Sequence, residues 1–381
     1  MSETVPSDSG EQNRRLYSID VIKGFIIIAV VLLHFIIIVP SDEPRTGNSN
    51  LALQALYTGL MLFFIFSGYF FRPEKSSWSQ VKKRLIIIGT VTVAGLVILP
   101  VIMYVYVTLL GYGTDPMDLP QCFRSLFGNW KIFNIDTNED FPIFAIHNGY
   151  YFLQIMLVSF VLFYPIAVRV VNDDRKLIVA IILLVTGTFV LAEFVGCELP
   201  LYSQLAPIAT AFMLVGAFLG KHKVIERIEY GELTSKWNLM YLAIAAVVGV
   251  VMLVLFEPGV YFDDTIFGDY GGYSAYPYFI ICCAFCYIFL SIGVVLNKIP
   301  GLRKILSTLG RHTLGILCLH IFVLKLLIAP FYDLVRRYAF PDFAITEKLV
   351  IGLIGIAICG ILLEYVFPRA TAKLREIASR D

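Results

Sequence analysis

The chain has 381 residues, of which 58% are hydrophobic and only 15% are charged. A soluble domain carries about 25% charged residues, so this composition excludes an ordinary soluble protein. The net charge is +1, and the basic residues form no aromatic-studded face of the kind that binds nucleic acid. The apolar residues come in blocks of about 20, the length of a membrane-spanning helix. We therefore predict an integral, multi-pass membrane protein.

Ten apolar segments follow one another along the chain, and they predict an all-α polytopic bundle of about ten transmembrane helices. Residues 1–16 are expected to form a disordered cytoplasmic tail, residues 17–368 the membrane domain, and residues 369–381 a second cytoplasmic tail. The segments are 19–39, 51–71, 85–110, 146–168, 177–196, 202–220, 239–256, 275–297, 312–331 and 347–367.

Lys and Arg residues concentrate in alternate connections between these segments. If the N-terminus is cytoplasmic, 22 of the 30 basic residues lie in inner connections or tails, and six lie in outer connections. Positively charged connections stay on the cytoplasmic side, so both termini are predicted to be cytoplasmic and the membrane to be the cytoplasmic (inner) one. The sequence contains no internal repeat, which gives no support to an inverted-repeat transporter.

The first segment carries three ionisable side chains, Asp20, Lys23 and His34. A charge at the centre of a membrane helix costs about 2.5–3.5 kcal/mol, so it persists where it faces a protein interior or a wet cavity. Lys23 and His34 are eleven residues apart, which at about 100° per residue points them in nearly the same direction. Asp20 lies one turn before Lys23. All three are therefore predicted to share one helix face.

The spacing suggests a use for that face. Lys23 and His34 are separated by roughly 16 Å along the helix, which is comparable to an extended pantetheine arm. His34 is the best available base, because an imidazole titrates near neutral pH, or it carries the acyl group itself. Each residue also has an ordinary explanation: helix capping for Asp20, snorkelling for Lys23 and a buried hydrogen bond for His34.

Later segments supply further candidates. Ser67, Gly68 and Tyr69 offer either close backbone approach near a thioester or a tightly packed helix. Arg84 is expected either to bind the phosphates of coenzyme A or to serve as ordinary cytoplasmic charge. His320, inside the ninth segment, is either a donor to the acyl carbonyl or a structural partner. Metal-ligand spacing is absent from the sequence, so no metal site is expected.

Four stretches resemble the acyltransferase-3 family of membrane acyltransferases, in its sugar O-acetylase-like branch. "DVIKGFIIIAVVLLH", Asp20 to His34, matches the pattern of an Asp, a basic residue with Gly, and a His eleven positions later. "LFFIFSGYFF" (62–71), "VKKRLIIIGTVTVAGLVILP" (81–100) and "LGRHTLGILCLH" (309–320) resemble the second, third and late segments. Many members have Arg at the position of Lys23, and Lys offers phosphate a point charge instead of a fork.

The resemblance implies transfer of an acyl group, most often acetyl, from cytoplasmic acyl-CoA to a hydroxyl of a cell-envelope carbohydrate or lipid-linked sugar. An O-acetyltransferase or O-succinyltransferase would use acyl-CoA as co-substrate and hold no permanent cofactor. The alternatives are a proton-coupled transporter or exporter of a glycan or lipid-linked sugar, and a non-catalytic membrane partner; the acyl group, acceptor and oligomeric state stay open. The expected catalytic residues are His34, Asp20 and Lys23, and the expected substrate-binding residues are Lys23, Phe64, Ser67, Gly68, Tyr69, Arg84 and His320.

Overall fold

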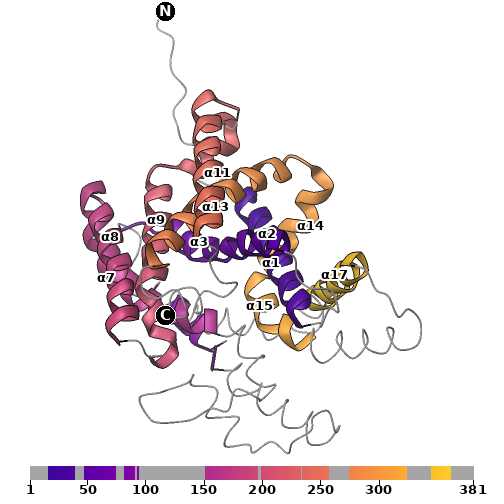
Figure 1. The fold of residues 1–381 in the computed structure, drawn as a ribbon, viewed down its shortest axis with the longest axis horizontal. Helices are drawn as coiled ribbons and strands as arrows, with labels where there is room; N and C mark the ends of the chain where they lie inside the picture. Colours follow the sequence, from indigo (N-terminus) through magenta and orange to yellow (C-terminus); the bar gives the residue numbers. More distant parts are fainter. Residues whose placement is uncertain are drawn as a thin grey trace, which may run out of the picture.

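The structure is a computed structural model that describes residues 16–38, 47–73, 81–90, 92–93, 151–195, 199–232, 234–256, 274–323 and 345–361. These described residues are nearly all helical and contain no strand (Figure 1). The predicted all-α polytopic bundle is therefore confirmed. The division into a membrane domain and two tails stays a prediction, because the tails lie almost entirely outside the described residues.

Most of the labelled helices follow the predicted apolar segments closely, and two short ones, at 224–227 and 300–311, lie in predicted connections. Inside the second segment a 3-10 turn, Gly59–Met61, joins α2 to α3, and residues 81–90 form a further helix at the start of the third segment. The helices are α1 (Tyr17–Ile38), α2 (Gly47–Thr58), α3 (Leu62–Tyr69), α7 (Tyr151–Val170), α8 (Asp174–Val190), α9 (Ala206–Lys221), α10 (Val224–Arg227), α11 (Lys236–Phe256), α13 (Ala275–Asn297), α14 (Pro300–Arg311), α15 (Thr313–Phe322) and α17 (Ile345–Ile361).

Six helices among the described residues are long and apolar enough to cross a membrane. They are Tyr17–His34, Phe152–Val170, Asp174–Phe194, Leu201–Lys221, Lys236–Phe256 and Ala275–Asn297. Two shorter apolar helices, Gln54–Tyr69 and Gly352–Ile361, occupy two more of the predicted segments. The predicted segment 85–110 lies mostly outside the described residues, so the count of ten stays a prediction.

Helix α1 is at the centre of one half of the bundle and packs on α14, α13, α15 and α17 (Figure 1). Its contact with α14 is the tightest, because glycines allow the two backbones to touch. A Cβ on Gly24 would lie 1.9 Å from the carbonyl oxygen of Leu306, and one on Gly310 would lie 1.8 Å from that of Asp20. Small residues bring membrane helices together in this way.

Helices α3 and α9 approach each other by the same means. A Cβ on Gly68 would lie 1.8 Å from the carbonyl oxygen of Met213, and one on Gly216 would lie 1.9 Å from that of Ile65. Each helix therefore places a glycine against the backbone of the other. Gly216 and Gly220 stand four residues apart on α9, the spacing that presents two small residues on one helix face.

Polar contacts join the connections that were predicted to be cytoplasmic. Ser18 at the start of α1 donates to Glu229 at 2.5 Å, and the side-chain amide of Asn297 at the end of α13 donates to the same carboxylate at 3.0 Å. Lys221 at the end of α9 pairs with Asp174 at the start of α8 at 2.7 Å. The start of α1 therefore lies near the end of α13, and the start of α8 lies near the end of α9. The alternation of charge predicts both arrangements, because it places all four ends on the cytoplasmic side.

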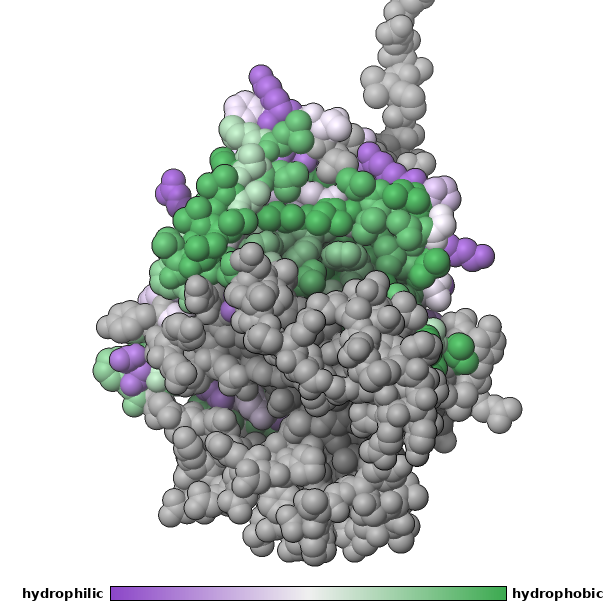
Figure 2. Space-filling view, turned by 45° about the vertical axis from the view of Figure 1, so that its right-hand side comes forward, coloured by the Kyte–Doolittle hydropathy of each residue, from purple (hydrophilic) through white to green (hydrophobic). Residues whose placement is uncertain are grey.

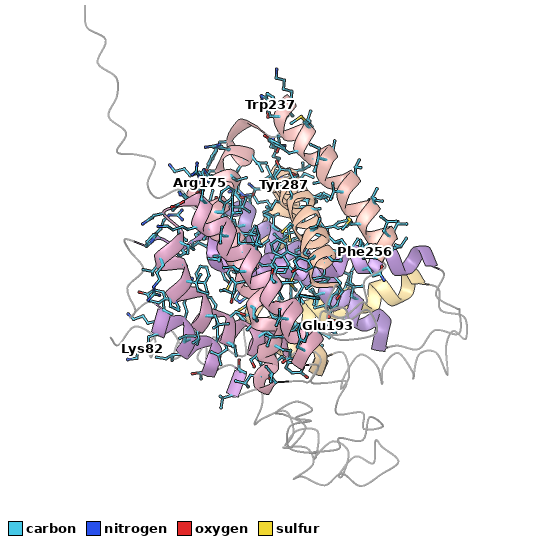
Figure 3. The ribbon with its side chains drawn as sticks, turned by 60° about the vertical axis from the view of Figure 1, so that its left-hand side comes forward. Lys82, Arg175, Glu193, Trp237, Phe256 and Tyr287 are labelled. Atoms are coloured by element: carbon cyan, nitrogen blue, oxygen red, sulfur yellow. The ribbon has the colours of Figure 1, made fainter. Side chains whose placement is uncertain are left out.

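Apolar side chains cover the outside of the bundle, as a bilayer requires. Helix α11, which carries Trp237 near one end and Phe256 at the other, lies at the edge of the bundle (Figure 3). Val247 and Leu255 on this helix are 63% and 70% exposed. The space-filling view shows a broad hydrophobic area with hydrophilic residues near its border (Figure 2).

Candidate active site

Helix α1 lies antiparallel to the segment formed by α2 and α3. The Nζ atom of Lys23 lies 5.7 Å from the centre of the Phe66 ring on α3. The ring of His34, further along α1, lies 6.3 Å from that of Tyr57 on α2. Lys23 and His34 therefore both face the segment that runs from α2 to α3, in agreement with the common face that their spacing predicts.

His34 is buried in the membrane part of the bundle. Its Nδ1 atom lies 2.8 Å from the carbonyl oxygen of Val30, and its side chain is only 6% exposed. A carbonyl can only accept a hydrogen bond, so this contact assigns the ring proton to Nδ1. The Nε2 atom is buried and has no hydrogen-bond partner within the described structure. It is left as a bare lone pair, which is the form that accepts a proton.

His320 on α15 has the same arrangement. Its Nδ1 atom lies 3.1 Å from the carbonyl oxygen of Ile316 and 2.9 Å from that of Leu317, so Nδ1 again carries the proton. Its side chain is fully buried, and Nε2 has no partner among the groups that the structure describes. The two rings contact each other with centroids 5.0 Å apart and planes at 78°. Two imidazoles thus share one buried site.

Two basic residues approach neighbouring positions of α3, towards the cytoplasmic side. Arg84 donates from Nη1 to the carbonyl oxygen of Ser67 at 3.3 Å, next to the Phe66 ring that Lys23 contacts. Asp20 is half-buried one turn before Lys23 on α1. The predicted phosphate-binding residues therefore approach one helix turn, although their role stays a prediction. Two cations near one turn of α3 would suit an anionic ligand.

The remaining predicted residues of the second segment pack inside the bundle. Phe64 is fully buried, with its ring centroid 4.7 Å from that of Phe152. Gly68 contacts the backbone of α9. Tyr69 is buried and donates from its hydroxyl to the carboxylate of Glu226 on α10. Packing accounts for Phe64 and Gly68, and their predicted contact with substrate stays untested.

Sequence reasoning missed two features of this site. Tyr57 was not singled out, because one tyrosine in an apolar segment carries a weak signal. The segment 298–311 was assigned to a cytoplasmic connection, yet residues 300–311 form α14 and pack on α1. Leu302, Ile305, Leu306 and Leu309 give α14 a helical apolar pattern, which would have predicted it.

A groove of about 420 Å³ lies away from Lys23 and His34, between α11 and α13, and apolar residues such as Ile244 and Phe279 line it. In the part of the chain that the structure describes, no group of three His, Cys, Asp or Glu side chains is placed to hold a metal ion.

Comparison with protein families decides what kind of protein carries this site. The family model for an acyltransferase domain matches residues 16–367, which include α1 and α15 with both histidines. The chain belongs to the acyltransferase-3 family. Comparisons with curated proteins and with solved structures gave no match.

As a member of the acyltransferase-3 family, the protein is a membrane acyltransferase. Family membership favours this activity over the transporter and the non-catalytic partner that the sequence alone left open. An acyltransferase-3 protein needs a base for the attacking hydroxyl and a way to hold the acyl donor. The buried imidazoles and the basic residues near α3 are the groups in the described structure whose chemistry suits these two tasks.

Proposed function

We propose that this protein transfers an acetyl group from cytoplasmic acetyl-CoA to a hydroxyl of a cell-envelope carbohydrate or lipid-linked sugar. The observation that carries the proposal is His34, whose Nε2 atom is buried without a partner while Nδ1 is held by a helix carbonyl. An imidazole in this tautomer accepts the proton of an attacking alcohol. A succinyl group would require the same chemistry, so the acyl group is a matter for experiment.

In this mechanism, Nε2 of His34 takes the proton from the acceptor hydroxyl while the oxygen attacks the carbonyl carbon of the thioester. The carbon–sulfur bond then breaks, and coenzyme A leaves as the thiolate while His34 holds the proton. Lys23 and Arg84 hold the phosphates of the donor near the cytoplasmic end of α3, and the pantetheine arm extends along α1 towards His34. Lys23 and His34 are separated by roughly 16 Å along α1, which is close to the length of the extended pantetheine arm. Asp20 lies beside Lys23 and orients it.

The proposal is tested by mass spectrometry of envelope glycans from cells with and without this gene. We expect a group of acetyl mass to disappear from one glycan when the gene is removed. Loss of a group of succinyl mass would show that the transferred group is succinyl and not acetyl. An unchanged glycan profile would contradict the proposed class of acceptor.

A variant then tests the residue. His34→Ala should abolish O-acylation while the protein still inserts in the membrane at the wild-type level. The matched control is His222→Ala, because His222 lies near Asp174 at the cytoplasmic edge, away from the buried site of His34 and His320. Acylation at the wild-type level in His34→Ala would remove the central assignment.

A further inference from the structure

We propose that His34 and His320 work as one acid–base pair that holds a single shared proton during turnover. The inference rests on the proposed function and extends it, because it assigns the group that protonates the leaving thiolate. His320 thereby becomes a second catalytic residue, distinct from a donor to the acyl carbonyl or a structural partner.

The geometry supports a pair because the two rings are close and isolated. Their centroids are 5.0 Å apart in an edge-to-face contact, and their side chains are 6% and 0% exposed. Within the described residues, the titratable side chain in ring contact with the pair is Tyr57 of α2. Beyond Tyr57, α13 contributes Tyr278 and Cys282, which interact with each other. In the part of the chain that the structure describes, the ring contacts of the two histidines thus include no carboxylate and no ammonium group.

The hydrogen bonds determine which atoms react. Each Nδ1 atom is occupied by carbonyl oxygens of its own helix, so neither ring uses Nδ1 to exchange protons. Each Nε2 atom is buried without a partner in the described structure. The two rings are in contact, and no hydrogen bond joins their Nε2 atoms among the contacts that the structure describes. Nε2 is therefore the atom of each ring that is left to exchange a proton with the substrates.

The transfer step balances with one proton on the pair. At the start, Nε2 of His34 is bare and Nε2 of His320 carries the proton. His34 takes the proton of the acceptor hydroxyl, the oxygen forms a bond to the thioester carbon, and the carbon–sulfur bond breaks. His320 gives its proton to the departing thiolate. The new ester and the free thiol leave, and the proton on His34 moves to His320 to restore the pair.

This step predicts a pH dependence with two limbs. When the pair holds two protons, His34 has no lone pair to act as base, so the rate falls as the pH falls. When the pair holds none, His320 has no proton to give, so the rate falls as the pH rises. The two ionisations belong to the pair and not to either ring. A bell-shaped profile of kcat/KM for the acyl donor is therefore expected of the wild-type protein.

Two variants separate catalysis from packing. His320→Asn keeps a donor near the Nδ1 position for the carbonyl of Ile316, whereas His320→Gln keeps a hydrogen-bonding group near the Nε2 position. Neither side chain titrates. Both should lower kcat by about 100-fold or more, as loss of one acid–base group does, and should leave the KM for acetyl-CoA near the wild-type value. Leu314→Met on the same helix is the volume-conserving control, because Leu314 packs on the core and holds neither histidine.

The measurements are made on the full chain in membranes with acetyl-CoA and extracted envelope glycan. Support requires a bell-shaped wild-type profile that loses the high-pH fall in His320→Gln, together with reduced kcat in both variants. A wild-type profile with one ionisation, or a His320→Gln variant with wild-type kcat, would overturn the pair. Acetylated His34 trapped with donor alone would overturn direct transfer. Wild-type protein that transfers no acyl group to any glycan would instead count against the proposed function.

Discussion

Replacing Gly310 by alanine should separate α14 from α1, because the glycine lets the two backbones touch. A Cβ at this position would lie 1.8 Å from the carbonyl oxygen of Asp20 and 2.7 Å from its carbonyl carbon. Ordinary van der Waals contact begins at 3.4 Å, so the new methyl group is about 1.6 Å too close. The obstacle is backbone, which cannot move aside as a flexible side chain does.

The cost follows from this geometry. Overpacking a well-packed core typically costs about 1–3 kcal/mol, and a backbone-on-backbone clash belongs at the upper end of that range. We therefore expect Gly310→Ala to lower the free energy of unfolding by about 3 kcal/mol, even though alanine favours a helix over glycine by about 1 kcal/mol. The change is measured as the thermal unfolding temperature of the purified protein in one detergent.

Gly301→Ala is the matched control, since it makes the same substitution in the same helix. Gly301 has no atom within 4 Å of an added Cβ among those that the structure describes. Its unfolding temperature should therefore stay at or slightly above the wild-type value. If Gly310→Ala were as stable as Gly301→Ala, α14 would not pack on α1 as described, and the reasoning would be refuted.

Three more substitutions test contacts at the cytoplasmic ends. Lys23→Ala should raise the KM for acetyl-CoA more than it lowers kcat in steady-state assays, and an unchanged KM would reject its phosphate role. Tyr69→Phe removes the hydrogen bond to Glu226 and should lower the free energy of unfolding by about 1.5–3 kcal/mol, the contribution of a hydrogen bond to a charged group. An unfolding temperature equal to that of the wild type would contradict this. Ser18→Ala removes the hydrogen bond to Glu229 and should lower the free energy of unfolding by a similar amount, about 1.5–3 kcal/mol. A lower unfolding temperature in a thermal scan would show this loss.

The long apolar helices were predictable from sequence because composition alone defines them. The segment 275–297 coincides with α13, and 19–39 differs from α1 by two residues at the start and one at the end. The second segment, 51–71, was predicted as one helix but contains α2, the Gly59–Met61 turn and α3. Hydropathy averages over this turn, because most residues on both sides of it are apolar.

Helix α14 shows what a count of basic residues leaves out. Arg303, Lys304 and Arg311 assign the segment 298–311 to a cytoplasmic connection, but they do not show that this connection contains an amphipathic helix. The charges lie on its exposed side, while Leu306 and Gly310 are buried against α1. A search for period 3.6 in the connections would have found it.

The histidine pair could not be predicted from spacing. Each histidine is recognisable as an ionisable group within an apolar segment, but 285 residues lie between His34 and His320. Their contact depends on where α15 lies against α1, and no local pattern specifies that. The hydrogen bonds at Nδ1 are more predictable, because a helical side chain reaches the carbonyl three or four residues before it.

The glycine contacts provide a physical reason why α15 is placed beside His34. Gly310 rests on the backbone of Asp20, and only His312 separates the end of α14 from the start of α15. His34 follows Asp20 by roughly 21 Å of helix, and His320 follows Thr313, the first residue of α15, by roughly 11 Å. The α1–α14 contact therefore anchors on α1 the point from which α15 begins. If so, Gly310→Ala should lower kcat in the fraction that remains folded, whereas Gly301→Ala should leave it unchanged. Lost stability with full kcat per folded molecule would show that the pair is positioned by α17 or α13 instead.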